Sequence, residues 1–330
     1  MTLHVRQPGI QTTVQDLGRP ATQHLGVPVG GPMDRAAHRI ANLLVGNDED
    51  AAAIECAFGG LALQATGTTL LALTGRRITA SCDGRAVAAW RPIVLHQGEQ
   101  LVIHDACRTT IAVAGGIDVP VLLGARGTSM RGGFGGFQGR ALRRDDVLPL
   151  GVAGATSRRI MMHLAAAART QAPWGAGPSL RPSYDAGPVL RIIAGPELPL
   201  LSATARRTFL SDSFRVAPDS DRMGFRLAGH TLDMHEAREM FSSGVTAGTV
   251  QLPPAGSPIV LMADRQTTGG YPRLGDVISV DLPLLAQLRP GETVRFTLVS
   301  LEIAQALLLH HERDLVTARR GLELLLHGIA

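Results

Sequence analysis

The sequence predicts a mainly β fold in two strand-rich halves, with a few peripheral helices. Between residues 51 and 150, short apolar runs are separated by turn residues about every ten positions, which is typical of β-sandwiches and barrels. Little of this region has helical periodicity, and a parallel α/β sheet requires helices between its strands. Asp83-Gly84 is a strong signal for a tight hairpin turn.

The composition fits a globular protein. The chain has 330 residues, of which 45% are hydrophobic and 18% charged, enough for two domains of ordinary size. We expect domains at residues 1–175 and 176–330, with the proline- and alanine-rich segment 158–188 as the linker. A net charge of +4 and 4% aromatic residues do not indicate nucleic-acid binding. Neither a signal segment nor a membrane span is recognisable, so a cytoplasmic location is expected.

The sequence contains no lysine, and this absence limits the chemistry. Schiff-base catalysis, a Walker-type phosphate loop and biotin carried covalently by this chain all require a lysine amine. Three widely spaced cysteines, Cys56, Cys82 and Cys107, indicate buried thiols in a reducing compartment rather than disulfides. The eleven histidines have no ligand spacing, so no metal site is predicted.

The first half opens with short strands near residues 3–5 and 10–14, followed by a polar turn. Gln15, Asp16 and Arg19 of this turn are candidate substrate-binding residues. A helix should begin at Asp34, because apolar residues then recur on one face until residue 44. Glu55 lies in apolar surroundings, either as a buried, paired structural carboxylate or as a further binding residue.

Residues 124–144 are rich in glycine and carry five arginines. Without a lysine or a following helix they do not form a nucleotide-binding loop. An anion-binding flap, a partner-docking loop and an ordinary surface loop all remain open.

The second half is expected to contain strands at 189–194, 214–216, 277–280 and 293–299, and helices at 201–209, 282–288 and from 300 towards 326. After the second of these strands, Arg222 and Arg226 bracket Gly224. Their guanidinium groups could bind substrate in a cleft or form salt bridges with Asp219 and Asp221.

A polar loop follows the most regular pair of strands. Residues 245–252 and 258–263 are apolar runs separated by a Pro-Pro-Ala-Gly turn, which predicts a β-hairpin. The loop after it supplies the candidate catalytic residues Asp264, Gln266, Thr267 and Tyr271 and the candidate substrate-binding residues Arg265 and Thr268. A capped turn without function is the competing interpretation. A straight hairpin would put Gln251 far from Asp264, so Gln251 is expected to be peripheral.

Four segments carry a resemblance to a known family. They are residues 9–60, residues 112–128 (AVAGGIDVPVLLGARGT), residues 221–229 (DRMGFRLAG) and residues 243–282, which include ADRQTTGGYPRLGDVISVD. The chain resembles the allophanate hydrolase subunit 2 family, which includes the C subunit of bacterial 5-oxoprolinase, the KipA antagonist of a kinase inhibitor and part of the carboxyltransferase domain of urea carboxylase. The resemblance covers nearly the whole chain.

The resemblance implies two cyclophilin-like β-barrel domains and an obligate partner. That partner is an allophanate hydrolase subunit 1-like protein, similar to KipI and to the B subunit of 5-oxoprolinase, and it acts with the A subunit of 5-oxoprolinase. The implied activity is ATP-dependent hydrolysis of the lactam 5-oxo-L-proline to L-glutamate, with ATP bound in the assembly. Two alternatives remain: a biotin-dependent carboxyltransferase component acting on a urea-like amide, and a non-catalytic antagonist of a kinase inhibitor.

Overall fold

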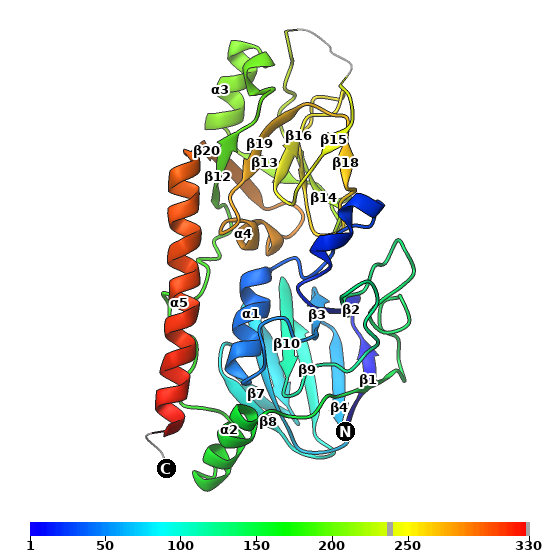
Figure 1. Cartoon of the computed structure of the whole chain (residues 1–330), viewed down its shortest axis with the longest axis vertical. Helices are drawn as coiled ribbons and strands as arrows, with labels where there is room; N and C mark the ends of the chain where they lie inside the picture. The colour runs from blue at the N-terminus through cyan, green and yellow to red at the C-terminus, as the bar shows by residue number, and fades with distance from the viewer. Residues whose placement is uncertain (236–239, 328–330) are drawn as a thin grey trace. The chain divides into compact units, whose positions relative to one another are not determined.

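The structure, a computed structural model, describes residues 1–235 and 240–327 (Figure 1). The chain forms two compact units that each take segments from distant parts of the sequence. Residues 1–19, 34–182 and the described part of 312–330 form the first unit, and residues 20–33 with the described part of 183–311 form the second. The proposed domain boundary at residues 175 and 176 lies shortly before the first unit's segment 34–182 ends.

The first unit consists of two antiparallel sheets. One has the strand order β11-β1-β4-β9-β6-β7 and the other the order β2-β3-β10-β5-β8. The strands are β1 (Thr2–Pro8), β2 (Gln11–Gln15), β3 (Ala53–Ala57), β4 (Leu61–Ala65), β5 (Thr69–Arg76), β6 (Thr79–Cys82), β7 (Arg85–Val87), β8 (Pro92–Leu95), β9 (Gln100–Asp105), β10 (Arg108–Val113) and β11 (Val147–Pro149). The predicted Asp83-Gly84 hairpin is confirmed between β6 and β7.

Both sheets contribute to one apolar core in the first unit. Leu3 and Leu63 from one sheet and Ile54, Leu73 and Ile111 from the other belong to the same fully buried cluster. Burying a side chain of this size stabilises a fold by roughly 2 kcal/mol before conformational entropy is counted. The strands are therefore held in register by which residues face this core.

Two helices and part of a third complete the first unit. Helix α1 (Arg35–Leu44) begins as predicted, because Oδ1 of Asp34 accepts a hydrogen bond of 2.8 Å from the backbone N–H of Ala37. Helix α2 (Ala155–Ala166) corrects the prediction of a linker from residue 158. Its alanines have high helix propensity, which outweighs the absence of a clear apolar stripe. Helix α5 (Leu301–His327) enters the first unit at Glu312, which forms a two-bond ion pair with Arg39.

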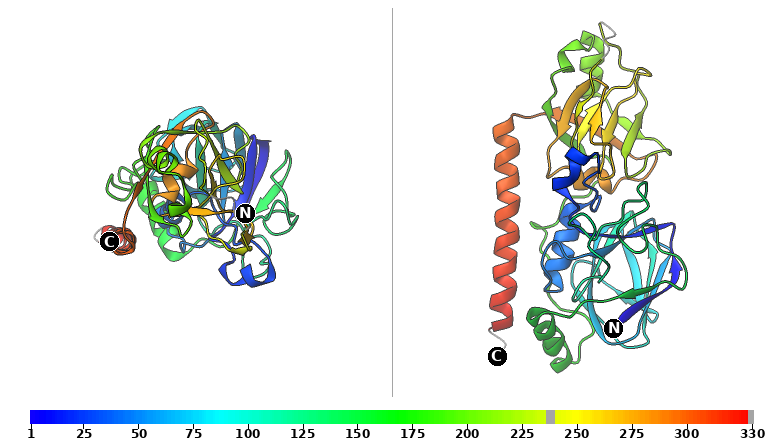
Figure 2. Two further views of the ribbon diagram at one scale, coloured as in Figure 1. Left: turned by 90° about the horizontal axis from the view of Figure 1, so that it is seen from above. Right: turned by 45° about the vertical axis from the view of Figure 1, so that its right-hand side comes forward.

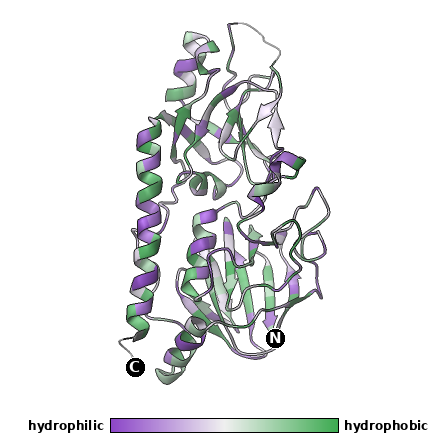
Figure 3. Cartoon of the chain, in the orientation of Figure 1, coloured by the Kyte–Doolittle hydropathy of each residue, from purple (hydrophilic) through white to green (hydrophobic). Residues whose placement is uncertain are grey.

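Helix α5 is one continuous rod with hydrophobic and hydrophilic residues along its length (Figures 2 and 3). Within residues 1–235 and 240–327, no helix combines the length and the low polarity that a membrane span requires.

A buried histidine on α1 should make stability depend on pH. His38 is fully buried, and burial lowers its pKa from the ordinary 6.5 to about 4. The amide nitrogen of Asn42 can only donate, so the contact of 3.2 Å requires Nε2 of His38 to accept, as in the neutral ring.

Between pH 6.5 and 4 the unfolded chain therefore binds more protons than the folded chain. We expect the His38 contribution to stability, about 3 kcal/mol, to be fully present above pH 6.5 and lost as the pH falls towards 4. Urea unfolding of the wild type and of His38→Gln across this range measures it. Equal pH slopes for both proteins would contradict the prediction.

The second unit is a closed barrel with the strand order β12-β19-β16-β17-β14-β13-β20 (Figure 1). Its strands are β12 (Val189–Ala194), β13 (Phe214–Val216), β14 (Gly224–Ala228), β16 (Thr249–Gln251), β17 (Ile259–Leu261), β19 (Arg273–Val277) and β20 (Thr293–Leu298). A small sheet pairs β15 (Ser243–Gly244) with β18 (Thr268–Gly269). The helices are η1 (Pro20–Leu25), η2 (Leu198–Leu200), α3 (Ala203–Ser211), α4 (Leu282–Ala286) and the part of α5 that precedes Glu312.

The barrel closes around an aromatic core. Strand β20 pairs with β12 on one side and β13 on the other, and the ring centroids of Phe296 on β20 and Phe209 are 4.9 Å apart. The mainly β fold with few helices is confirmed, as is the hairpin of β16 and β17. One strand begins earlier than predicted: β19 starts at Arg273 and ends at Val277, because its ladder partners on β12 and β16 lie opposite this stretch.

Candidate functional site

Backbone hydrogen bonds within the second unit hold the polar loop 264–271 at its start and near its end. The backbone N–H of Asp264 donates to the carbonyl oxygen of Arg222 at 2.8 Å, which ties the loop to the turn before β14. Farther along, Thr268 and Gly269 form β18 and pair with β15. The loop is therefore presented by backbone hydrogen bonds at two separate points.

Arg222 and Asp264 form a buried ion pair. Nε and Nη2 of Arg222 lie 2.8 and 2.9 Å from the two carboxylate oxygens, and Arg222 is only 4% exposed. Nη2 also donates to the carbonyl oxygen of Gly31 at 2.6 Å. Arg226 instead lies on the surface, with Nε 3.1 Å from Asp219, which is the salt-bridge alternative that its sequence context allowed.

Arg265 differs from these two arginines because its charge is not balanced. It is 5% exposed, and Nε donates to the carbonyl oxygen of Val245 at 3.3 Å. Within the part of the chain that the structure describes, no carboxylate lies within salt-bridge distance of it. Burial alone lowers the pKa of Arg265, yet a guanidinium stays protonated at neutral pH. The loop therefore holds a buried cation that an anionic ligand would neutralise.

Gln251 adds a second buried donor beside the loop. It is 2% exposed, and its Nε2 has no hydrogen-bond partner among the described residues. A Cβ on Gly269 would lie 2.4 Å from this nitrogen, so any larger residue there would have to displace the Gln251 amide. Gln251 was expected to be peripheral, but it lies beside Gly269 of the loop, because β16 lies between β17 and β19 in the barrel. Its part in a site stays a prediction.

A sequence signal for Gln251 existed. Thr-Val-Gln occurs at residues 13–15 and again at 249–251, and each glutamine ends a strand. Gln15 is also buried, its Oε1 has no partner among the described residues, and a Cβ on Gly127 would lie 3.0 Å from it. The repeated tripeptide marks two buried amides that each face a glycine.

The remaining loop residues are more accessible. Gln266 and Thr267 are half-buried and Thr268 is exposed. Tyr271 is 46% exposed and lines a cavity of about 650 Å³ whose walls also include Leu252, Pro253, Pro254, Asp233 and Met240. The structure thus brings Asp264 to Arg222 and places Tyr271 on this cavity; the catalytic roles of Asp264, Gln266, Thr267 and Tyr271 stay predictions.

The other candidate binding residues lie in the first unit, where Asp16 organises the glycine-rich segment. Its Oδ1 accepts backbone N–H bonds from Gly18 and Gly127 at 3.0 and 3.1 Å, and its Oδ2 accepts one from Arg126. Arg19 donates from Nη2 to the carbonyl oxygen of Gly127 at 2.6 Å. Segment 124–144 is therefore tied to the turn at residues 15–19.

Glu55 is a buried carboxylate with a partner. Nη1 of Arg108 lies 3.1 Å from its Oε1, and Glu55 is enclosed by the first unit. This is the geometry of the paired structural carboxylate; a binding role for Glu55 stays a prediction.

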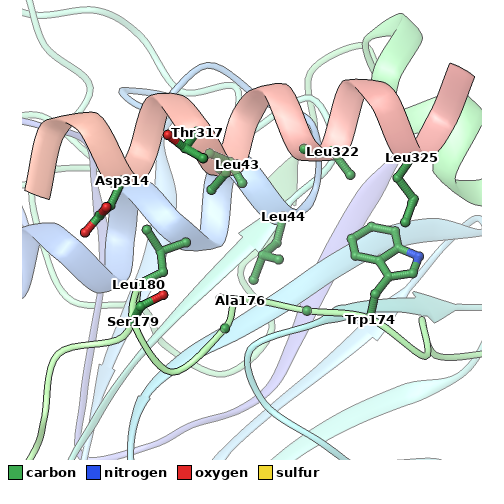
Figure 4. A pocket seen from close by; sticks show the side chains of 14 residues that line it. Leu43, Leu44, Trp174, Ala176, Ser179, Leu180, Asp314, Thr317, Leu322 and Leu325 are labelled. Carbon is green, nitrogen blue, oxygen red and sulfur yellow. The ribbon is translucent and has the colours of Figure 1, made fainter.

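Another cavity, of about 340 Å³, lies in the first unit and contains none of the predicted site residues. Figure 4 shows Trp174 and leucines of α1 and α5 around it. Its walls are mainly apolar but also include the side chains of Ser179, Asp314 and Thr317.

The described residues offer little for metal binding or redox chemistry. Among residues 1–235 and 240–327, no three His, Cys, Asp or Glu side chains are placed to hold a metal ion. The cysteines are free and buried, and burial raises the pKa of the Cys82 thiol to about 12.

Known proteins resemble this chain over most of its length. Residues 25–298 match the family described as carboxyltransferase domain, subdomain A and B. The chain is 38% identical to the C subunit of 5-oxoprolinase from Escherichia coli, over 92% of this chain and 93% of the relative. It is 34% identical to the C subunit of 5-oxoprolinase from Haemophilus influenzae, over 94% and 95%.

A solved structure shares the fold. The urea amidolyase of K. lactis has a TM-score of 0.86 at 27% identity, over 96% of this chain and 20% of that longer one. The resemblance seen in the sequence is thus confirmed by relatives of two kinds, separate subunits and segments of large enzymes. The chain belongs to the carboxyltransferase domain, subdomain A and B, family.

Proposed function

We propose that this chain is the C subunit of an ATP-dependent 5-oxoprolinase, which opens 5-oxo-L-proline to L-glutamate together with partner subunits. Two relatives carry that name and match it nearly end to end. We expect the partners to be the A subunit of the enzyme and a protein similar to its B subunit. The reaction takes place in the cytoplasm, a location that three buried free thiols suit.

The observation that carries the proposal is the unbalanced charge of Arg265. The substrate is a five-membered lactam with one carboxylate, and a buried guanidinium is a strong partner for such an anion. Arg222 and Arg226 already have carboxylate partners, whereas Arg265 has none among the described residues. We assign Arg265 to the substrate carboxylate and the Nε2 of Gln251 to a second oxygen of the substrate.

The chemistry divides between the chain and its partners. Phosphorylation of the lactam oxygen by ATP releases ADP and makes the carbonyl carbon electrophilic. Water then attacks this carbon, the C–N bond breaks and the nitrogen takes a proton, and hydrolysis of the resulting carboxyl phosphate by a second water releases inorganic phosphate and glutamate. Within this chain Asp264 is the candidate base for the attacking water. Each of its oxygens accepts one N–H from Arg222, which fixes its orientation and leaves lone pairs for the proton.

Replacing Arg265 with methionine should weaken substrate binding without unfolding the chain. Loss of a charge-assisted contact to the carboxylate should lower kcat/KM for 5-oxoproline by about 100-fold in the mixed subunits. Removing an unbalanced buried charge should leave thermal stability unchanged or higher. The measurement is ATP-dependent glutamate release together with a melting curve.

Arg226→Met is the matched control, because this arginine is exposed and paired with Asp219; its activity should stay within about twofold of the wild type. Full activity of the mixture without this chain would refute the proposed function. Full activity of Arg265→Met would refute the role of Arg265.

The second candidate function is carboxyl transfer to a urea-like amide. It is favoured by 30% identity to the urea amidolyase of Lachancea kluyveri, of which this chain covers 17%. Because this chain has no lysine, the biotin would be on a separate carrier. Urea-dependent loss of carboxyl groups from carboxybiotin, in place of glutamate release, is the result that would select this function.

A further inference from the structure

Three consecutive apolar side chains project from the first unit. Val121, Leu122 and Leu123 are 56%, 44% and 50% exposed. A run of three exposed apolar residues loses hydrophobic stabilisation and promotes aggregation, so it is usually retained only for a function. We call residues 121–123 the apolar tip.

The backbone at the apolar tip is strained. Leu122 and Ala125 exchange backbone hydrogen bonds of 2.8 and 3.2 Å around the two central residues Leu123 and Gly124. Both central residues have positive φ, 53° and 79°, as in a type I′ turn. Asn-Gly is the favoured pair for this turn, whereas leucine is disfavoured at positive φ. The chain therefore keeps a leucine where asparagine would fold more easily.

The base of the apolar tip is held firmly. Nη1 of Arg126 donates to the carbonyl oxygen of Val119 and lies 3.0 Å from Asp118. The backbone N–H groups of Arg126 and Gly127 donate to Asp16. Hydrogen bonds on both sides of the turn thus fix the direction in which the leucines project, and a preformed projection loses little entropy on binding.

We propose that the apolar tip docks into an apolar socket with an acidic rim on another subunit of the assembly. This rests on the proposed function. The related region of K. lactis urea amidolyase is 20% of a longer chain, so this fold occurs joined to further protein. Residues 118–146, which include the apolar tip, contain five arginines and three aspartates and no other charged residue, so this segment carries a net positive charge that an acidic rim would complement. Arg131, Arg143 and Arg144 are exposed and, in the described part of the chain, their guanidinium groups form no ion pair.

The sharpest test is Leu123→Asn, which keeps the turn and removes the apolar side chain. It should raise Tm by about 2–4 °C, since asparagine tolerates positive φ. It should weaken assembly with the two purified partner subunits of the same organism at least tenfold. Sedimentation without substrate or ATP measures the assembly. A residue important only for folding could not show higher stability with weaker binding.

Val152→Asn is the control, because this apolar residue is 91% exposed in the same unit and should assemble like the wild type. Unchanged assembly of Leu123→Asn would overturn the proposal, as would failure of the wild type to bind either partner. Self-association that Leu123→Asn abolishes would overturn it too, and would assign the apolar tip to a second copy of this chain. An assembly that depends on Leu123 but releases no glutamate would keep the docking and reject the proposed function.

Discussion

Replacing Arg222 with methionine should lower the free energy of unfolding by about 3–5 kcal/mol, because the carboxylate of Asp264 would be left without its partner in a largely buried site. Arg222 donates to both oxygens of Asp264 and also to the carbonyl oxygen of Gly31. These bonds join three distant parts of the second unit. Losing these hydrogen bonds should therefore destabilise the whole barrel and not only one loop.

Chemical denaturation of the single and double variants measures this effect. Arg222→Met with Asp264→Leu should recover part of the loss, because no unpaired charge remains, but the Gly31 carbonyl still lacks its donor. Arg226→Met removes an exposed pair with Asp219 and should cost less than about 1 kcal/mol. A loss below about 1 kcal/mol in Arg222→Met would show that the pair contributes little to stability.

Replacing Asp16 with alanine should destabilise the first unit by about 3 kcal/mol, since three backbone N–H groups lose a charged acceptor at once. These are the N–H groups of Gly18, Arg126 and Gly127. Asp16→Asn should cost less, because one amide oxygen can still accept the two bonds that Oδ1 accepts now. The apolar tip should also lose its fixed direction.

The two Asp16 variants separate a structural from a substrate-binding role. Stability is measured by urea unfolding, and activity is measured at a temperature where Asp16→Asn remains folded. A purely structural Asp16 leaves the KM for 5-oxoproline unchanged in Asp16→Asn. A raised KM with unchanged stability would establish the predicted contact with substrate.

Local sequence signals predicted most elements of the fold. Asp34 marked the start of α1 because a short acceptor before an apolar stripe caps a helix, and Asp83-Gly84 marked a hairpin because both residues tolerate positive φ. The strands of the barrel followed from apolar runs between turns. These features depend on residues only a few positions apart.

Contacts between distant residues were not predictable in the same way. Arg222 and Asp264 are 42 residues apart, and their pairing depends on how the barrel closes. The same closure puts Gln251 against Gly269, which a straight hairpin does not suggest. The candidate loop 264–271 could be predicted from the sequence. That its arginine, Arg265, has no carboxylate partner among the described residues depends on where the chain's distant charges lie in the fold.

The way the chain supplies its two units also sets an order of completion during synthesis. Residues 20–33 belong to the second unit but are synthesised before all the rest of that unit. The hydrogen bond from Arg222 to the carbonyl oxygen of Gly31 can therefore form only much later. The first unit is completed later still, because the ion pair between Arg39 and Glu312 can form only after the last helix has been synthesised. Proteins usually finish an N-terminal domain while the rest is being translated. Here a stop codon after residue 311 would leave the second unit whole and the first unit without its C-terminal segment.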